Sequence, residues 1–463
     1  MRIDQGTACP APNRHRPAKT RRRWCAHLQS PGFEDTMHQA SIQRCERSRT
    51  ELSSESGHVV VLLHEGFYGA VSGSGFSNRA FLTALAQDLP HGLLVVVPVV
   101  LSPTHPGRDP EWEADVERML AKAGATVLPL HGEAMLTSPV GCEALSAMAV
   151  RRAAPYLRGR SLLVGCDVPF LAVGSYAPKG ADVLLVPRST AAMVRPADSP
   201  QIAWERRGLT AAVAGGGLVA AISDHMKDHL TGTYGLPDGV VLDLPNGLLP
   251  ADRAVVHGPV LPLPAGATDG FVLAMGRAEE SKGFADLLHA VGILGDQGVE
   301  VPHLVLVAAS TCERNAHQQQ LCALIDRLGI EVTLLTRFDP RVRGWLGDPA
   351  LRAVVVPSRA EPFGRIPLEA FAAGAGPVVA TTAGGLAQTV LDGVTGYSAP
   401  PASPRALAGA LRRALEASPS DRARLAEAGA RLLAERHDYA VSVRAVLEQC
   451  APWALSARAG VSR

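Results

Sequence analysis

The chain has 463 residues, of which 47% are hydrophobic and 19% charged, and its formal net charge is +1. This length accommodates two domains with a sizeable core each. The balanced charge argues against a nucleic-acid-binding protein and provides no polybasic anchor for an anionic membrane. No run of 18 or more apolar residues occurs, so no transmembrane helix is predicted. The longest apolar stretches, residues 92–101 and 209–222, are interpreted as a buried strand and a buried helix.

The eight cysteines are widely scattered and none forms a C-x-x-C pair. This spacing favours free thiols in a reducing cytoplasm over a disulfide framework.

Residues 1–56 contain a basic run at Arg21–Arg23, many Ser, Gln and His residues, and no sustained apolar period. A secretory signal needs an apolar segment after its basic start, and none follows here. The segment is predicted to be a disordered leader. Met37 is an alternative initiator, and the sequence leaves open whether residues 1–36 belong to the native protein.

Strand-like apolar runs alternate with helical patterns across residues 57–250, which predicts βαβ units and a parallel sheet. Strands are expected at 58–63, 93–100, 125–130, 161–164 and 183–186, and helices at 76–89 and 112–123.

Five prolines between residues 245 and 264 interrupt this pattern, and residues 251–265 are predicted to be an interdomain linker. A second alternating series then spans residues 266–430, and residues 431–463 are expected to form a C-terminal helix and tail. The fold class is therefore α/β, with two Rossmann-like, doubly wound domains and the ligand between them. Strands are expected at 271–275, 304–307, 332–335, 353–356 and 378–380, and helices at 285–294, 318–328, 367–373, 405–416 and 420–437.

The most informative motif runs from Ser358 to Ala370, directly after a predicted buried strand. Glu361 is expected on the loop after that strand and Glu369 in the first turns of the next helix, where Pro367 suits the opening position. A strand, a glycine turn and a helix start together can form a site for a phosphate-bearing ligand. One carboxylate near a helix start is more often a solvated cap.

The string as a whole resembles the E-x7-E motif of retaining GT-B glycosyltransferases of family-four type, the glycosyl transferases group 1. The downstream stretches 373–381, Gly384-Gly385 and 392–397 follow the family's order. The resemblance implies that Glu369 binds the ribose and Glu361 the transferred sugar of a nucleotide-diphosphate donor. Phe363, Gly364 and Arg365 are then expected at the donor as well.

Arg277 and Lys282 lie in a second motif, G-R-x-x-x-x-K-G, directly after another predicted strand. Preorganised cations stabilise the charge that develops on a departing phosphate, and both side chains suit phosphate oxygens. On their own, two such cations are more often surface charge. Here they resemble the family's diphosphate clamp, which assigns catalytic roles to Arg277, Lys282 and Glu361.

Gly73 and Gly75 follow the first predicted strand and resemble the family's glycine pair near the donor phosphates; a plain surface turn is the alternative. His64, Asp167 and Arg188 follow predicted strands of the first domain and are candidates for the acceptor side. Two departures from the family concern positions 308–310, which lack the usual glycine, and Gln388, which replaces a glutamate.

The resemblance implies a metal-independent, retaining glycosyltransferase without a cofactor, with a nucleotide sugar as co-substrate. The lack of a basic amphipathic surface helix favours a small, soluble acceptor, and the Ala- and Arg-rich composition suggests a bacterial source. Neither a metal site nor a nucleic-acid partner is expected, and the oligomeric state stays undetermined. Two alternatives remain at this point: a non-catalytic GT-B protein that binds a nucleotide sugar, and a nucleotide-sugar epimerase.

Overall fold

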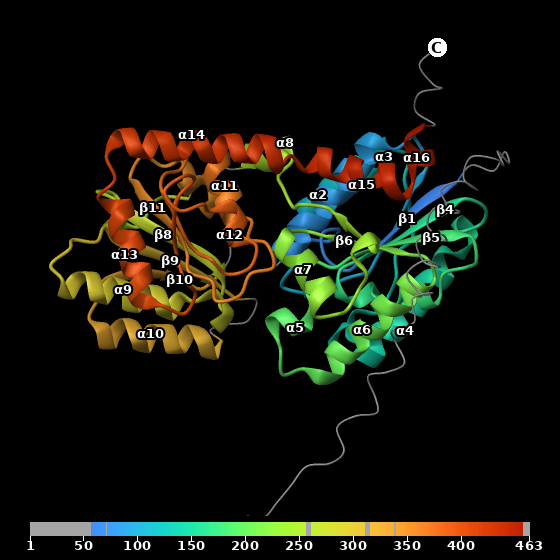
Figure 1. The fold of residues 1–463 in the computed structure, drawn as a ribbon, viewed down its shortest axis with the longest axis horizontal. Helices are drawn as coiled ribbons and strands as arrows, with labels where there is room; N and C mark the ends of the chain where they lie inside the picture. The colour runs from blue at the N-terminus through green and yellow to red at the C-terminus, as the bar shows by residue number, and fades with distance from the viewer. Residues whose placement is uncertain (1–56, 71, 256–260, 311–314, 338, 457–463) are drawn as a thin grey trace, which may run out of the picture. The chain divides into compact units, whose positions relative to one another are not determined.

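The computed structural model describes residues 57–456 except for residues 71, 256–260, 311–314 and 338. The predicted leader, residues 1–56, lies outside the described residues. The described chain contains two separate sheets, and every strand pair in them is parallel (Figure 1). This confirms the predicted α/β class.

The first sheet has seven strands in the order β3-β2-β1-β4-β5-β6-β7. In its centre β1 pairs with β2 on one side, with Val59 opposite Leu94, and with β4 on the other side, with His58 opposite Ser161. The central strands read as continuous apolar runs because both faces of a parallel sheet are covered. The strands are β1 (His58–Leu63), β2 (Leu94–Pro98), β3 (Thr126–Val127), β4 (Ser161–Cys166), β5 (Ala181–Val186), β6 (Leu218–Ala221) and β7 (Val241–Asp243). The helices are α2 (Gly73–Asp88), α3 (Pro110–Lys122), α4 (Pro139–Ala153), α5 (Ala191–Val194), α6 (Ser199–Ala214), α7 (Asp224–Gly232) and α8 (Pro250–Val255).

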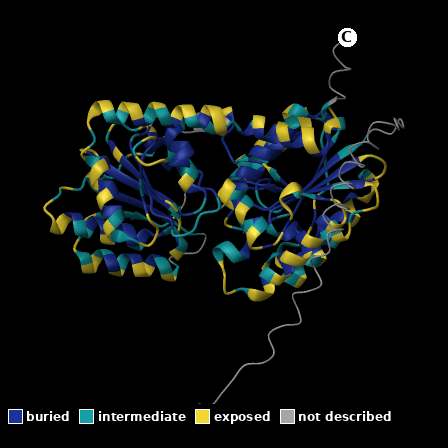
Figure 2. Cartoon of the chain, in the orientation of Figure 1, coloured by how far each residue is buried: buried dark blue, intermediate teal, exposed yellow. Residues whose placement is uncertain are grey.

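The second sheet has six strands in the order β10-β9-β8-β11-β12-β13. One of its faces packs against α9, α10 and α13 in a single apolar cluster. Figure 2 shows the central strands of both sheets as buried, while the helices expose one side. The strands are β8 (Phe271–Arg277), β9 (His303–Ala309), β10 (Val332–Leu335), β11 (Leu351–Val356), β12 (Val378–Thr381) and β13 (Tyr397–Ala399). The helices are α9 (Phe284–Asp296), α10 (Ala316–Leu328), α11 (Ile366–Ala372), α12 (Leu386–Thr389), α13 (Pro404–Leu415), α14 (Pro419–Arg436), α15 (Tyr439–Cys450) and α16 (Pro452–Ser456).

Helix starts follow local capping chemistry. The side chain of Asn315 accepts the backbone N–H of Gln318 at the start of α10, and the Gln318 side chain accepts the backbone N–H of Asn315. At the start of α14 the hydroxyl oxygen of Ser418 accepts the backbone N–H of Asp421, and a proline lies in the first turn of this helix. These caps satisfy N–H groups that have no partner inside the helix.

The interpretation of residues 209–222 as one helix is wrong. Helix α6 ends at Ala214, and β6 begins at Leu218. Three consecutive glycines separate them, and Gly216 has a φ of +82°, which a residue with a side chain rarely adopts. The apolar run is therefore a helix end, a turn and a strand start. Helix α4, which the sequence did not predict, precedes β4.

The last helices return to the first sheet. We call the part of the fold built on the first sheet the first half and the part built on the second sheet the second half. Helix α14 belongs to the second half. Helix α15 packs on α2, and the apolar residues of α15 join the core of the first half. The first half of the fold is therefore completed by the C-terminal end of the described chain. In the predicted linker, α8 occupies Pro250–Val255. The domain boundaries themselves stay predictions.

The two chain segments that connect the halves lie side by side. The backbone N–H of Leu248 donates to the carbonyl of His437 at 3.0 Å, and His437 Nδ1 lies 2.8 Å from the carbonyl oxygen of Asn246. A Cβ at position 247 would collide with the His437 carbonyl, so this crossing requires Gly247. Burial lowers the pKa of His437.

Two valines of α15 test whether this helix stabilises the first half. Val443 is fully buried and Val441 is 66% exposed on the same helix. We expect Val443→Ala to lower the free energy of unfolding by about 2 kcal/mol, because it removes two buried methyl groups and leaves a cavity. Val441→Ala is the matched control and should change it by less than about 0.5 kcal/mol. Urea unfolding measures both; equal values would show that α15 is not part of the core.

Candidate functional site

The order of the strands reverses at two points, between β8 and β11 in the second sheet and between β1 and β4 in the first. Chain connections leave such a pair in opposite directions, which opens a crevice at the carboxyl ends of the two strands. Arg277 ends β8, and Glu361 follows β11 by five residues. The two main sequence motifs therefore meet at one switch point.

Arg277 is the last residue of β8, and Lys282 lies on the loop that follows. Arg277 is 47% exposed at its side chain and forms an ion pair with Glu279 at 2.8 Å. A single 3-10 turn, Glu280–Lys282, follows, and Gly283 has a φ of +66°. A Cβ at Gly283 would collide with the carbonyl oxygen of Pro357 at the end of β11. Only glycine permits this close approach of the two loops.

The close approach places Lys282 against Glu361. The ammonium nitrogen lies 2.5 Å from Glu361 Oε2, and the two side chains are only 18% and 14% exposed. The hydroxyl of Ser358 donates to the same carboxylate oxygen at 3.2 Å. Lys282 and Glu361, the first carboxylate of the E-x7-E motif, thus form an ion pair although they lie 79 residues apart in sequence.

A second ion pair holds the two loops together. Arg359 binds Asp286 with two hydrogen bonds, of 2.7 and 2.8 Å, and its backbone N–H donates to the carbonyl of Ser281 at 2.7 Å. The hydrogen bond to Asp286 and the charge of Glu280 raise the pKa of Arg359. Arg359 lies inside the motif of residues 358–370 and Asp286 just after the G-R-x-x-x-x-K-G motif, but neither was predicted as a site residue, because their pairing depends on the tertiary approach of the two loops.

Glycines shape the turn that holds Glu361. Gly364 has a φ of +89°, and Gly384 a φ of +53°. A Cβ at Gly384 would collide with the Glu361 carbonyl, and the same carbonyl accepts the N–H of Gly385 at 3.0 Å. The Gly-Gly stretch after β12 therefore fixes the backbone of Glu361. Gly364 lies in the same turn, and its positive φ is one that a residue with a side chain rarely adopts.

Glu369 lies in α11, with Pro367 in the first turn as predicted. Its carboxylate is 6% exposed and is held from two sides, by Arg343 Nε at 3.2 Å and by Arg365 Nε at 3.5 Å. Sequence reasoning missed Arg343, because no recognised motif contains it. Two arginines thus orient the second carboxylate of the motif.

Phe363 and Arg365, which were expected at the donor, have structural contacts. The Phe363 ring is 2% exposed and meets the His437 ring edge-on at 5.5 Å. Arg365 donates to the carbonyl of Gly247 at 3.2 Å and pairs with Asp252 at 3.5 Å. The Phe363 ring thus fills space beside the connection between the halves. The donor-binding roles expected for Phe363 and Arg365 stay predictions.

Gly73 and Gly75 form the first turn of α2 instead of a separate loop before it. Ser72 caps this helix, accepting from the N–H of Gly75 at 3.5 Å and donating to Glu65 at 2.5 Å. A Cβ on Gly75 would collide with Ala70, whereas the nearest atom to a Cβ on Gly73 is Arg365 Cδ at 3.9 Å. The first glycine thus lies beside the loop that follows Glu361.

The three acceptor-side candidates differ in their surroundings. Arg188 is 2% exposed, and its guanidinium donates to Asn78, Asn246, Tyr439 and the Ser77 carbonyl at 2.8 to 3.3 Å. These contacts join α2, the connection and α15. The acceptor-side role of Arg188 stays a prediction. Asp167 is 5% exposed, has a φ of +69° and accepts from the N–H of Val168 at 2.9 Å. His64 directly follows β1, and its Nδ1 is buried without a hydrogen-bond partner.

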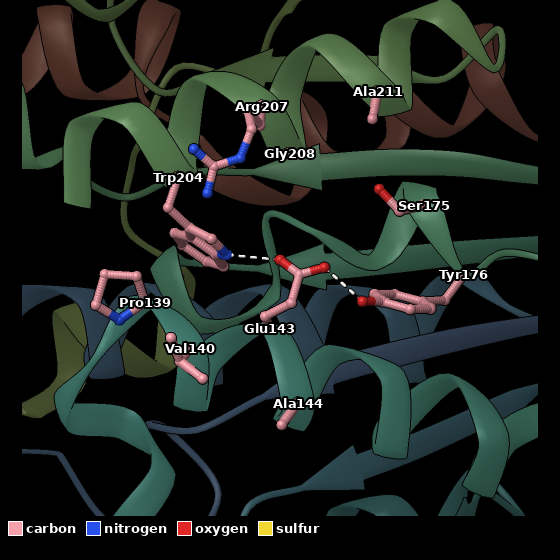
Figure 3. Close-up of a pocket in the computed structure, with 10 residues that line it drawn as sticks. All are labelled: Pro139, Val140, Glu143, Ala144, Ser175, Tyr176, Trp204, Arg207, Gly208 and Ala211. Atoms are coloured by element: carbon pink, nitrogen blue, oxygen red, sulfur yellow. Dashed lines mark hydrogen bonds between the residues drawn. The ribbon is translucent and has the colours of Figure 1, made fainter. Parts of the chain in front are cut away.

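A surface cavity of about 540 Å³ lies away from both switch points, between α4 and α6 (Figure 3). Its central carboxylate, Glu143, accepts hydrogen bonds from Trp204 at 2.7 Å and from Tyr176 at 2.5 Å. None of the residues singled out in the sequence lines this cavity. Both carboxylate oxygens of Glu143 already accept hydrogen bonds from within the protein. The candidate site is therefore placed at the switch point of the second sheet.

In the described part of the chain, no group of three or more His, Cys, Asp or Glu residues is arranged so that it could hold a metal ion. Over the same residues, no helix combines the length and apolarity that a membrane crossing requires.

Residues 263–432 match the family model described as "Glycosyl transferases group 1". Two curated relatives are named D-inositol 3-phosphate glycosyltransferase. That of Actinosynnema mirum is 33% identical over 210 residues, which cover 43% of this chain and 49% of the relative. That of Xylanimonas cellulosilytica is 32% identical over 267 residues, covering 56% and 62%. The match thus spans between 49% and 62% of the length of these relatives.

Solved structures share the fold over most of the chain. Anabaena Alr3699/HepE in complex with UDP and glucose aligns with a TM-score of 0.63 at 19% identity, over 84% of this chain and 98% of that chain. The sucrose-phosphate synthase of Thermosynechococcus elongatus aligns with a TM-score of 0.63 at 21% identity, over 84% and 97%. At these identities the likeness concerns the fold, which is the GT-B fold, as predicted.

The matched segment contains the switch point of the second sheet and both motifs that meet there, which include Arg277, Lys282, Glu361 and Glu369. The sequence resemblance to that family was confined largely to the same segment. Residues 263–432 are therefore the part of this chain that is similar to the glycosyl transferases group 1 family.

Proposed function

We propose that the chain is a glycosyltransferase that moves a sugar from a nucleotide-diphosphate donor to a hydroxyl group of an acceptor. The observation that carries this proposal is the 2.5 Å contact of Lys282 with Glu361 at the switch point of the second sheet, with Arg277 at the end of β8 just before the loop of Lys282. A cation for a phosphate and a carboxylate for sugar hydroxyls then stand next to each other. That is what the cleavage of a sugar–phosphate bond requires.

The two cations, Arg277 and Lys282, are proposed to stabilise the leaving group. When the sugar–oxygen bond breaks, negative charge develops on the departing diphosphate, and fixed positive charge stabilises it. Arg277 is paired with Glu279 at a half-exposed position, where such a pair contributes about 0 to 1 kcal/mol. A multiply charged diphosphate can therefore replace Glu279 at low cost. Lys282 is less exposed and would add a compact charge beside the bond that breaks.

The two carboxylates are proposed to bind different parts of the donor. Glu369, oriented by Arg343 and Arg365, would accept hydrogen bonds from ribose hydroxyls. Glu361 would accept hydrogen bonds from hydroxyls of the transferred sugar. With both engaged in binding, neither acts as a nucleophile; the acceptor hydroxyl attacks from the side of the leaving group, whose phosphate oxygen takes the proton. This geometry retains the α-configuration of the donor.

The acceptor is proposed to be a small, soluble compound that binds at the carboxyl edge of the first sheet. His64 and Asp167 follow β1 and β4, the strands that flank its switch point. The described cysteines Cys142, Cys166, Cys322 and Cys450 are free thiols, which supports a reducing compartment and hence the cytoplasm.

The clamp is tested by removing its lysine. We expect Lys282→Ala to lower kcat by about 100- to 1,000-fold, the range found when one preorganised charge-stabilising group is removed from an active site. Lys179→Ala, at an exposed position on the first half, is the matched control and should retain full activity. Turnover is measured by release of nucleoside diphosphate, and circular dichroism checks the fold. A fully active Lys282→Ala would contradict the clamp.

The stereochemical outcome tests the direction of attack. We expect an α-linked product from an α-configured nucleotide sugar, because nucleophile and leaving group share one face of the sugar. The anomeric coupling constant in the proton NMR spectrum of the product distinguishes the two configurations. A β-linked product would refute attack from the leaving-group side while leaving the transferase activity in place.

Metal independence follows from the proposal that Arg277 and Lys282 supply the positive charge that a divalent ion supplies elsewhere. We expect the rate of diphosphate release to be unchanged after treatment with excess EDTA and gel filtration. Adding Mg²⁺ or Mn²⁺ back should not raise it. Loss of activity with EDTA and recovery with either ion would show that the cations do not suffice.

A further inference from the structure

Arg343 makes two contacts that connect the halves of the chain. Its Nε lies 3.2 Å from Glu369 Oε2 in α11, and its guanidinium carbon lies 3.9 Å from the centroid of the Phe76 ring in α2. A guanidinium group can make both contacts at once, since it donates hydrogen bonds in its plane and stacks on an aromatic ring with its face. A lysine ammonium has no such face.

Both ends of this connection are rigidly held. Arg343 lies in the 3-10 helix Pro340–Gly347, which Trp345 anchors by donating from its indole nitrogen to the Leu261 carbonyl at 2.8 Å. On the other side, the Phe76 ring meets Trp112 edge-on at 5.0 Å. Trp112 in turn donates to the Gly66 carbonyl at 3.1 Å. The position of Arg343 is therefore defined by both halves.

The contacts involve parts of the chain to which we assign substrate binding. Phe76 directly follows Gly73, Ser74 and Gly75 in the first turn of α2, and Glu369 is the carboxylate proposed for the ribose. The Arg343 side chain is 11% exposed and that of Glu369 is 6% exposed. Burial lowers the pKa of Arg343, and the charge of Glu369 opposes this effect. A buried ion pair adds little net stability, so stability alone does not account for it.

The geometry points to Arg343 as a positioning residue that transmits the placement of Phe76 in the first half to the carboxylate of Glu369 in the second. This inference rests on the proposed function, because it takes Glu369 as the ribose ligand. With the ring in place, Arg343 has one orientation and presents the carboxylate ready for hydrogen bonds. Without the ring, the guanidinium gains freedom that nucleotide binding must then remove.

The test measures binding of UDP, GDP and ADP to the full chain by isothermal titration calorimetry and continues with the tightest binder. Phe76→Leu keeps an apolar side chain and leaves Glu369 untouched, and Arg343→Lys keeps the charge without the flat face. We expect each to raise Kd about 3- to 30-fold, as the loss of a desolvated cation–π contact would. In the Arg343→Met background, Phe76→Leu should have no further effect, because the ring acts only through the arginine.

Arg413→Lys is the matched control. Arg413 also combines an aromatic ring, Tyr397 at 4.5 Å, with a carboxylate, Asp392 at 3.0 Å, but both partners belong to the second half and the side chain is 48% exposed. Its Kd should stay within about 2-fold of wild type, since an exposed pair contributes little. Thermal unfolding checks that each variant is folded.

Two results overturn the inference while wild-type binding stands. One is a Phe76→Leu or an Arg343→Lys protein with wild-type affinity. The other is a Phe76→Leu effect of the same size in the wild-type and Arg343→Met backgrounds, which would show that the ring acts independently. A wild-type chain that binds none of the three diphosphates would instead remove the proposed function, and the inference with it.

Discussion

The contact between Lys282 and Glu361 depends on two loops that approach more closely than side chains normally allow. Gly283 permits this approach because a Cβ there would collide with the carbonyl oxygen of Pro357. The paired Arg359 and Asp286 then hold the loops in this position. Replacement of Gly283 would separate the cation from the carboxylate without altering either residue. The arrangement of the site thus begins with backbone sterics, and the charges follow.

Charge neutralisation inside the protein explains why the site can hold several ionised groups at low exposure. Each carboxylate of the E-x7-E motif has a cationic neighbour: Lys282 for Glu361, and Arg343 with Arg365 for Glu369. Buried charges without such partners would be costly. The same pairs preorganise the carboxylates, so that a ligand with hydroxyl groups meets acceptors whose orientation is already set.

The two halves are joined by more than the chain connections. Ser223 at the start of α7 donates to the carbonyl of Pro362 at 2.7 Å, and Gln388 accepts the N–H of Asp224 at 3.0 Å. The position at which this chain departs from the family's usual glutamate thus keeps a hydrogen-bond acceptor. Together with Arg343 on Phe76, these contacts hold the loop of Glu361 against the first half.

The sequence by itself determined the alternation of strands and helices, the two parallel sheets and the motif residues, because apolar periodicity and local turn chemistry act over a few residues. It misjudged residues 209–222, where apolar content alone does not distinguish a helix end from a strand. Only the tertiary structure decided that Arg188 and Phe363 are enclosed, that α15 completes the first core, and that Arg343 holds Glu369. Such pairings join residues far apart in the chain, and their partners are set by how the sheets and loops pack, which no local pattern records.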